Sequence, residues 1–146
     1  MPQRLTFLFF IAFFVTAASA ASAAEIGRIK STRGDAHIQR DGQRVSAALD
    51  TAVRATDTVV TGVDGAVGIT FIDNSRVSSG PNSVLVLNRY SFDQGTHAGT
   101  FDATLTRGTL AVVSGRMAKQ SPEAMTVRTP TMVLGVRGTE FLVYAE

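Results

Sequence analysis

Apolar and polar residues alternate over short stretches along most of the chain, and no stretch shows the three-to-four-residue spacing of an amphipathic helix. The alternating stretches are residues 36–39, 44–47, 58–61, 66–72, 76–78, 84–89, 101–105, 110–114 and 125–128. Residues that favour turns separate them at intervals of roughly eight to twelve residues. The pattern predicts an all-β fold, a single compact domain of short antiparallel strands and hairpins with roll-like, solenoid-like or sandwich-like packing.

Turn dipeptides indicate which stretches pair. Asp41-Gly42 and Asp64-Gly65 favour the positive φ angles of two-residue hairpin turns. We therefore expect one hairpin between residues 36–39 and 44–47 and another between residues 58–61 and 66–72. Gly80-Pro81-Asn82 predicts a further turn.

The stretch that follows this turn begins with Val84-Leu85-Val86-Leu87, so that both of its faces are apolar. A strand that is apolar on both faces is typical of the middle of a sheet. We therefore expect a central strand at residues 84–89.

Residues 129–144 form the most distinctive segment. Pro130 restricts the preceding residue to β-like angles, and the apolar positions change parity after Gly138. Glycines at 135 and 138 would permit a bulge, so we expect one bent strand with its kink at residues 137–139. Arg137 and Glu140 would then form an ion pair inside an apolar segment.

This segment resembles the closing motif of the FecR domain family, a periplasmic all-β module. The motif residues, to which we assign a structural role, are Thr129, Pro130, Gly135, Val136, Arg137, Gly138, Thr139, Glu140 and Phe141. Further landmarks resemble the family in the same order, at residues 61–62, 66–71, 80–87 and 107–110. Two departures stand out, because Thr56-Asp57 replaces the usual Gly-Asp and Asp73-Asn74-Ser75 replaces the usual Asp-Gly-Ser.

The first 24 residues have the pattern of a secretion signal. A short positive region ends at Arg4, an apolar run covers residues 5–15, and small-residue cleavage sites follow at residues 18–20 and 21–23. A membrane anchor is the alternative, but a spanning helix needs about 20 apolar residues and this run is shorter. We expect cleavage after residue 24, a FecR-like β domain at residues 25–146, and no membrane span after cleavage. The chain has no cysteine, which excludes a lipoprotein.

Charge and composition narrow the class of partner. Without the leader, 13 basic and 12 acidic residues remain, a net charge of +1. The basic residues are scattered singly, with no run of lysine or arginine, which argues against a nucleic-acid partner.

Catalytic and metal-binding patterns are weak. The chain has two histidines, His37 and His97. The sequence contains no G-x-S-x-G nucleophile elbow, and neither histidine is spaced with other ligands as in a zinc site. We interpret His37 as an ordinary strand residue and His97 as an ordinary loop residue. A triad around His97 with Asp93 or Asp102 is the alternative. The carboxylate pairs Asp64 with Asp73 and Asp93 with Asp102 could serve glycoside hydrolysis. Because all four lie in or beside expected turns, we assign them turn roles. We therefore predict no enzyme, no cofactor and no metal.

The resemblance implies a signalling module that relays the state of a receptor across the cell envelope. The sequence shows no cytoplasmic segment before the apolar run and no second hydrophobic span, so we expect a free-standing periplasmic domain. The expected partner is a protein or an envelope component, captured by strand addition at the edge of the motif strand. The alternative is a module that binds carbohydrate or peptidoglycan, for which the available aromatic platforms are Tyr90, Phe92, Phe101 and Tyr144.

Overall fold

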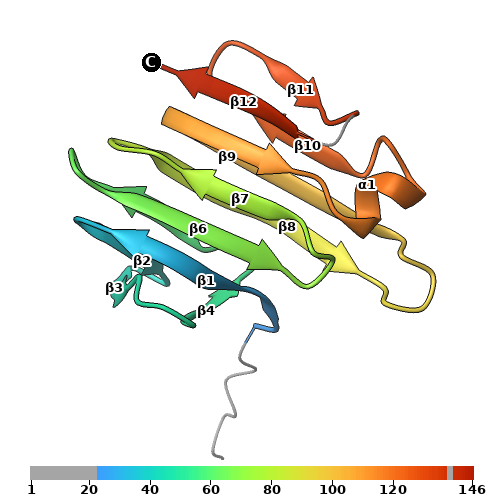
Figure 1. Cartoon of the computed structure of the whole chain (residues 1–146), viewed down its shortest axis with the longest axis horizontal. Helices are drawn as coiled ribbons and strands as arrows, with labels where there is room; N and C mark the ends of the chain where they lie inside the picture. Colours follow the sequence, from blue (N-terminus) through green and yellow to red (C-terminus); the bar gives the residue numbers. More distant parts are fainter. Residues whose placement is uncertain (1–22, 138–139) are drawn as a thin grey trace, which may run out of the picture.

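The computed structural model of the chain describes residues 23–137 and 140–146, which form two layers of strands and one short helix (Figure 1). The secretion signal that the sequence predicts therefore lies almost wholly outside the described residues. The strands are β1 (Glu25–Arg33), β2 (Ala36–Arg40), β3 (Gln43–Ser46), β4 (Ala52–Arg54), β5 (Thr58–Thr61), β6 (Ala66–Phe71), β7 (Arg76–Ser79), β8 (Val84–Phe92), β9 (Gly99–Val113), β10 (Met125–Arg128), β11 (Val133–Gly135) and β12 (Glu140–Ala145), and α1 is Arg116–Gln120.

The first layer has the strand order β4-β1-β6-β7-β9-β12 and lies nearer the viewer in Figure 1. The second layer has the order β3-β2-β5-β8-β9-β10-β11. Neighbouring strands are antiparallel except β9 and β10, which are parallel. The prediction of a single all-β domain is confirmed, with the packing of a folded-over sheet whose two layers share one strand.

The shared strand is β9, which leaves the second layer and enters the first at Gly108. Before this point β9 pairs with β8, and after it with β7 and β12. Gly108 has a φ of +97°, and a Cβ atom there would collide with Ser83. Only glycine combines this backbone angle with so close an approach, so the change of layer at Gly108 has a steric cause.

The space between the layers is filled by aliphatic side chains around three aromatic rings. Phe71, Tyr90 and Phe101 contact one another, with ring centroids 5.2 to 5.9 Å apart. The aliphatic members come from both layers and include Ile29, Ile38, Val53, Val59, Ile69, Val77, Leu85, Leu87, Leu105, Leu110, Val112 and Val143, all nearly inaccessible to solvent. The period-two alternation in the sequence thus separates the inner from the outer face of each strand.

The first expected hairpin is confirmed. β2 pairs with β3 in a register that places Arg40 opposite Gln43, and the turn residues Asp41 and Gly42 have φ angles of 50° and 75°. These are the positive angles that an Asp-Gly turn favours. β8, the strand that we expected to be central, lies between β5 and β9, which confirms that prediction as well.

The second expected hairpin is wrong. β5 and β6 do not pair: β5 lies between β2 and β8 in the second layer, whereas β6 lies between β1 and β7 in the first. Residues 62–65 carry the chain from one layer to the other, where the side chain of Asp64 accepts a hydrogen bond from the amide of Asp35 at 3.1 Å. A turn dipeptide fixes local backbone angles but not the partners of the strands on either side, and here the longer-range packing determined them.

Candidate functional site

The motif segment at residues 129–144 is not one bent strand. β10 and β11 form a hairpin in the second layer, and Thr129 lies in its turn, where its amide donates to the carbonyl of Met132 at 2.8 Å. β12 then lies in the first layer, paired with β9. The parity change that suggested a bulge therefore marks a crossing between layers. Gly138 and Thr139, where we placed the kink, lie outside the described residues.

The predicted ion pair between Arg137 and Glu140 is also wrong. The side chain of Arg137 is 74% exposed and lies 3.9 Å from Glu123, whose side chain is 84% exposed. Glu140 is exposed as well. The two residues lie at either end of the step from β11 in the second layer to β12 in the first, and neither charge is buried. The apolar motif residues Val136 and Phe141 do face inward, Val136 being 2% exposed and Phe141 half-buried.

β12 is the edge strand of the first layer. It pairs with β9 on one side, from Glu140 opposite Val113 to Ala145 opposite Gly108, and no described strand pairs with its other side. The backbone groups on this outer side are therefore available to a further strand. Figure 1 shows β12 at the upper side of the first layer, with β11 beyond it at the top of the view and β10 behind it.

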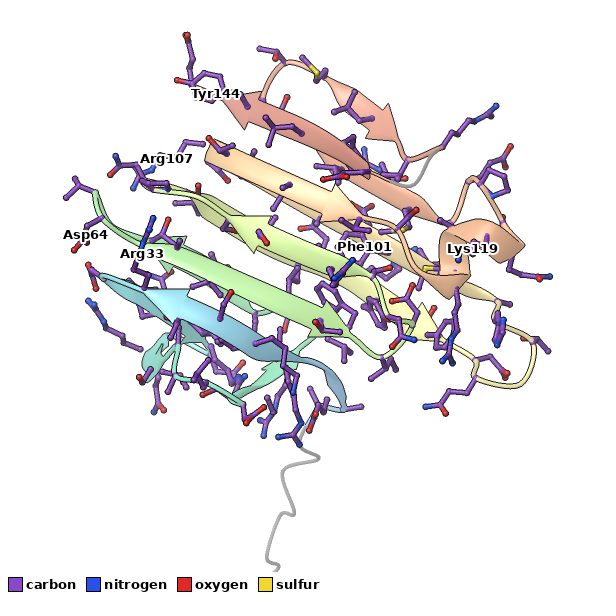
Figure 2. The ribbon with its side chains drawn as sticks, in the orientation of Figure 1. Arg33, Asp64, Phe101, Arg107, Lys119 and Tyr144 are labelled. Atoms are coloured by element: carbon purple, nitrogen blue, oxygen red, sulfur yellow. The ribbon has the colours of Figure 1, made fainter. Side chains whose placement is uncertain are left out.

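Side chains alternate strictly along β12. Val143 and Ala145 face the core, whereas Leu142 and Tyr144 face outward and are 71% and 66% exposed. Among the described residues, four of the seven exposed large apolar side chains come from the segment that holds β11 and β12, namely Met132, Val133, Leu142 and Tyr144. Such a concentration of exposed apolar surface is typical of an interaction site. In Figure 2 Tyr144 lies at the rim, whereas Phe101 lies inside the molecule.

A shallow groove of about 300 Å³ separates the ends of β11 and β12. Its lining includes the apolar side chains of Leu134 and Phe141 and the charged side chains of Arg137 and Glu140. The two charged motif residues thus frame a surface depression.

The two histidines lie in different parts of the fold. His37 is on β2 beside a polar hollow of about 490 Å³ that also includes Gln39, Asp41 and Arg44, and its Nδ1 atom is buried without a hydrogen-bond partner in the described structure. His97 has a φ of 60° in the loop after β8 and stacks on Phe92 at a centroid distance of 5.9 Å.

The four candidate carboxylates each have a local structural contact. Asp64 contacts Asp35 as described above. Asp93 accepts hydrogen bonds from the amides of Gly95 and Thr96, which lower the pKa of its carboxyl group. Asp102 lies within β9, not beside a turn as we expected, and pairs with Arg128 on β10 at 3.2 Å.

Asp73 is wholly buried and binds only neutral donors. Its carboxylate accepts hydrogen bonds from Ser75, through its hydroxyl at 2.6 Å and its amide at 3.1 Å, and from the Tyr90 hydroxyl at 3.0 Å. Burial and the nearby Asp73 charge raise the pKa of Tyr90, so its hydroxyl keeps the proton that it donates. The Ser75 hydroxyl in turn accepts from the amide of Gly115, which joins the β6–β7 turn to the segment before α1.

A second set of family landmarks meets at the opposite end of the layers. Thr61 at the end of β5 donates from its hydroxyl to the Gly80 carbonyl at 2.6 Å and accepts from the Ser83 amide at 2.9 Å. The Ser83 hydroxyl accepts from the amide of Thr109, just after the Gly108 bend, at 3.0 Å. These hydrogen bonds between landmark residues connect the two layers, so we assign Thr61, Ser83 and Thr109 a structural role.

One buried ion pair was not predicted from the sequence. Arg40 at the end of β2 holds the carboxylate of Asp57, whose side chain is 1% exposed. Asp57 also accepts from the amide of Arg54 at 2.8 Å. The signal was present, since Asp57 belongs to the Thr56-Asp57 landmark, but Arg40 looked like one of many scattered basic residues.

The aromatic platforms that a sugar-binding surface would need are only partly exposed. Tyr90 and Phe101 are buried in the core, Phe92 is half-buried against His97, and only Tyr144 is well exposed. Among the described residues, no group of three or more histidine, aspartate or glutamate residues is arranged to hold a metal ion. In the same part of the chain, no helix is long and apolar enough to cross a membrane.

Three comparisons place the chain among known proteins. A search of curated protein sequences and a search of solved structures found no significant match. The family model described as FecR protein matches residues 57–146. β1 and β2 precede this match but pair with β6 and β5 inside it. Because the match covers more than half of the sequence and includes the motif segment, the chain belongs to the FecR family.

Proposed function

We propose that this protein is a non-enzymatic binding module of the periplasm. It recognises a partner protein when a strand of that partner pairs with the outer edge of β12. The open edge of β12, with Leu142 and Tyr144 facing outward, carries this proposal. Strand addition supplies affinity through backbone hydrogen bonds and selectivity through alternate side chains. The proposed periplasmic location rests on the leader pattern at residues 1–24, and a role in signal relay rests on membership of the FecR family.

The other edges of the described sheets are less suited to strand addition. β4 and β11 have three residues each and β3 has four, whereas β12 has six. Proteins usually protect an exposed edge by shortening it or by placing charged residues or proline on it, and β12 has one charged residue, Glu140 at its start, and no proline. The length and composition of β12 therefore favour it as the docking edge.

The alternative, a carbohydrate- or peptidoglycan-binding module, has weaker support because Tyr90 and Phe101 are buried. Tyr144 is its best remaining platform, so Tyr144→Ala should abolish binding to purified peptidoglycan if that alternative is right. Unchanged binding after this substitution would dismiss it.

In-cell photo-crosslinking tests the proposal. A photoreactive residue is placed at Tyr144 and, as a matched control, at Val63, which is 81% exposed on the crossing between β5 and β6. We expect a discrete crosslinked protein from position 144 and none from position 63. Equal products from both positions, or none from position 144, would count against the β12 edge.

A further inference from the structure

The outward face of β12 has a symmetric pattern of charge. Glu140, Leu142 and Tyr144 alternate on this face, and Glu146, which follows the strand, is exposed and continues the alternation. The pattern is acidic, apolar, apolar, acidic at every second residue. Of this set, Leu142 and Tyr144 supply the apolar contact area and the two glutamates lie at its ends.

Neither glutamate forms an ion pair among the described residues, although Arg137 lines the same groove as Glu140 and lies nearer to Glu123. Across the strand pair, Glu140 lies opposite Val113, Leu142 opposite Ala111 and Tyr144 opposite Thr109, and the register ends at Ala145 opposite Gly108, one residue before Glu146. The nearest arginine in that row is Arg76 on β7, beyond Val113 and one strand further away. In a sheet, that separation is about 10 Å, too far for an ion pair. An incoming strand would thus supply the first cations that form ion pairs with Glu140 and Glu146.

A second copy of the chain fits this edge poorly. Two copies of β12 paired antiparallel over residues 140–146 would place Val143 opposite Val143, and Glu140 of each copy opposite Glu146 of the other. Like charges directly opposite one another destabilise a strand pair. The register that forms the most backbone hydrogen bonds is therefore the one that the two glutamates penalise, which is a recognised means of preventing edge-to-edge association.

The following inference rests on the proposed function. We propose that the partner strand has two apolar residues facing the same way as Leu142 and Tyr144, with a lysine or arginine two positions before and two positions after them, in the pattern basic-x-apolar-x-apolar-x-basic. Each basic residue lies opposite a glutamate, and the apolar residues cover Leu142 and Tyr144. Because the pattern of acidic and apolar residues on β12 is symmetric along the strand, the same partner sequence can pair with it in parallel or antiparallel orientation. The charges at the two ends select the partner and the backbone supplies most of the affinity.

Synthetic peptides test the proposal with the full chain. We compare Lys-Thr-Val-Thr-Ile-Thr-Lys with Glu-Thr-Val-Thr-Ile-Thr-Glu by fluorescence anisotropy at low salt. The wild-type protein should bind the lysine-ended peptide about tenfold more tightly, since two exposed cross-strand charge pairs contribute a few-fold each. The double variant Glu140→Lys with Glu146→Lys should reverse this order.

Glu25→Lys with Asp41→Lys is the matched control, because it makes the same change in net charge at exposed positions on β1 and in the β2–β3 turn, which do not contact β12. This control should keep the wild-type order, with the lysine-ended peptide bound more tightly. Equal binding of the two peptides to the wild-type protein, no binding of either, or an unchanged order in the Glu140 and Glu146 variant would overturn the proposal. A wild-type dimer that crosslinks between the two copies of Leu142 would identify a second copy as the occupant and would also overturn it. If position 144 still crosslinks a protein in cells when the peptide test fails, the proposed function stands and only the charge selection is lost.

Discussion

Arg40 and Asp57 form a two-point contact at the edge of the core. The Nε and Nη2 atoms of Arg40 donate to the two carboxylate oxygens of Asp57 at 2.9 and 2.7 Å, and Nη2 also donates to the carbonyl of Ala52 at 2.9 Å. The hydrogen bond to Asp57 raises the pKa of Arg40. The pair joins β2 to the turn before β5, and it explains why an aspartate stands at this landmark of the family.

Arg40→Met should destabilise the protein strongly. The substitution keeps most of the side-chain volume but leaves the buried Asp57 carboxylate without a cation, which typically costs about 3 kcal/mol. Chemical denaturation measures the change in the free energy of unfolding. Arg44→Met is the control, because Arg44 pairs with Asp35 on the surface and should change stability by less than about 1 kcal/mol. Equal losses in the two variants would contradict the role given to Asp57.

Thr56→Gly should stabilise the protein. Thr56 has a φ of 71°, a left-handed angle that a β-branched residue adopts at a cost, and it is exposed, so that little contact is lost. Relief of this strain should raise the free energy of unfolding by about 0.5 to 1 kcal/mol. The matched variant Thr58→Gly, two residues later in β5, should lower it. A loss of stability in Thr56→Gly would show that its backbone is not strained.

Asp73→Asn should destabilise the protein although it is nearly isosteric. The carboxylate of Asp73 receives only donors, and the NH₂ group of asparagine would face one of them without an acceptor. Burying an unsatisfied donor costs about 1 to 3 kcal/mol. Thermal unfolding provides the readout, with Asp93→Asn in the exposed loop as the control. A melting temperature equal to that of the wild type would show that the hydrogen bonds of Asp73 do not stabilise the fold.

The Asp102–Arg128 pair should contribute a pH-dependent part of the stability. Burial raises the pKa of Asp102, but hydrogen bonds from Arg128 and Asn88 outweigh it, so the pKa lies below its ordinary value. A carboxyl group with a lowered folded-state pKa stabilises the fold above its unfolded pKa of about 3.9, and this contribution disappears as the pH falls through the folded value. The wild type should therefore exceed Asp102→Asn in stability at pH 7, and the difference should shrink below about pH 4. Unfolding curves across this pH range measure the difference in the free energy of unfolding between the two proteins. A difference that stayed constant would show that the Asp102–Arg128 pair does not contribute to stability in this way.

The sequence allowed local features to be predicted better than long-range ones. Asp41-Gly42 identified a hairpin because a two-residue turn and its flanking strands are adjacent in the chain. Asp64-Gly65 is the same dipeptide but connects two layers, since β6 pairs with β1 and β7 in the first layer and not with β5. Strand partners depend on the whole packing arrangement, which a dipeptide does not encode.

The same limit applied to the candidate site. Of the motif glycines, Gly135 lies in the regular β10–β11 pair opposite Thr126, and Gly138 lies outside the described residues. Alternation in a sequence cannot show that β11 and β12 belong to different layers. For that reason Arg137 and Glu140 were placed inside the core although both are exposed. The outward alternation of Leu142 and Tyr144 was readable from the sequence, and the absence of a neighbouring strand was not.

Hydrogen–deuterium exchange on the protein with and without the partner crosslinked at Tyr144 tests the docking edge most directly. If a strand adds to β12, the β12 amides that do not bond to β9 gain new acceptors, and their exchange should slow while that of β3 and β4 stays unchanged. Protection confined to β3, β4 or the polar hollow beside His37, with β12 exchanging as in the free protein, would contradict the account.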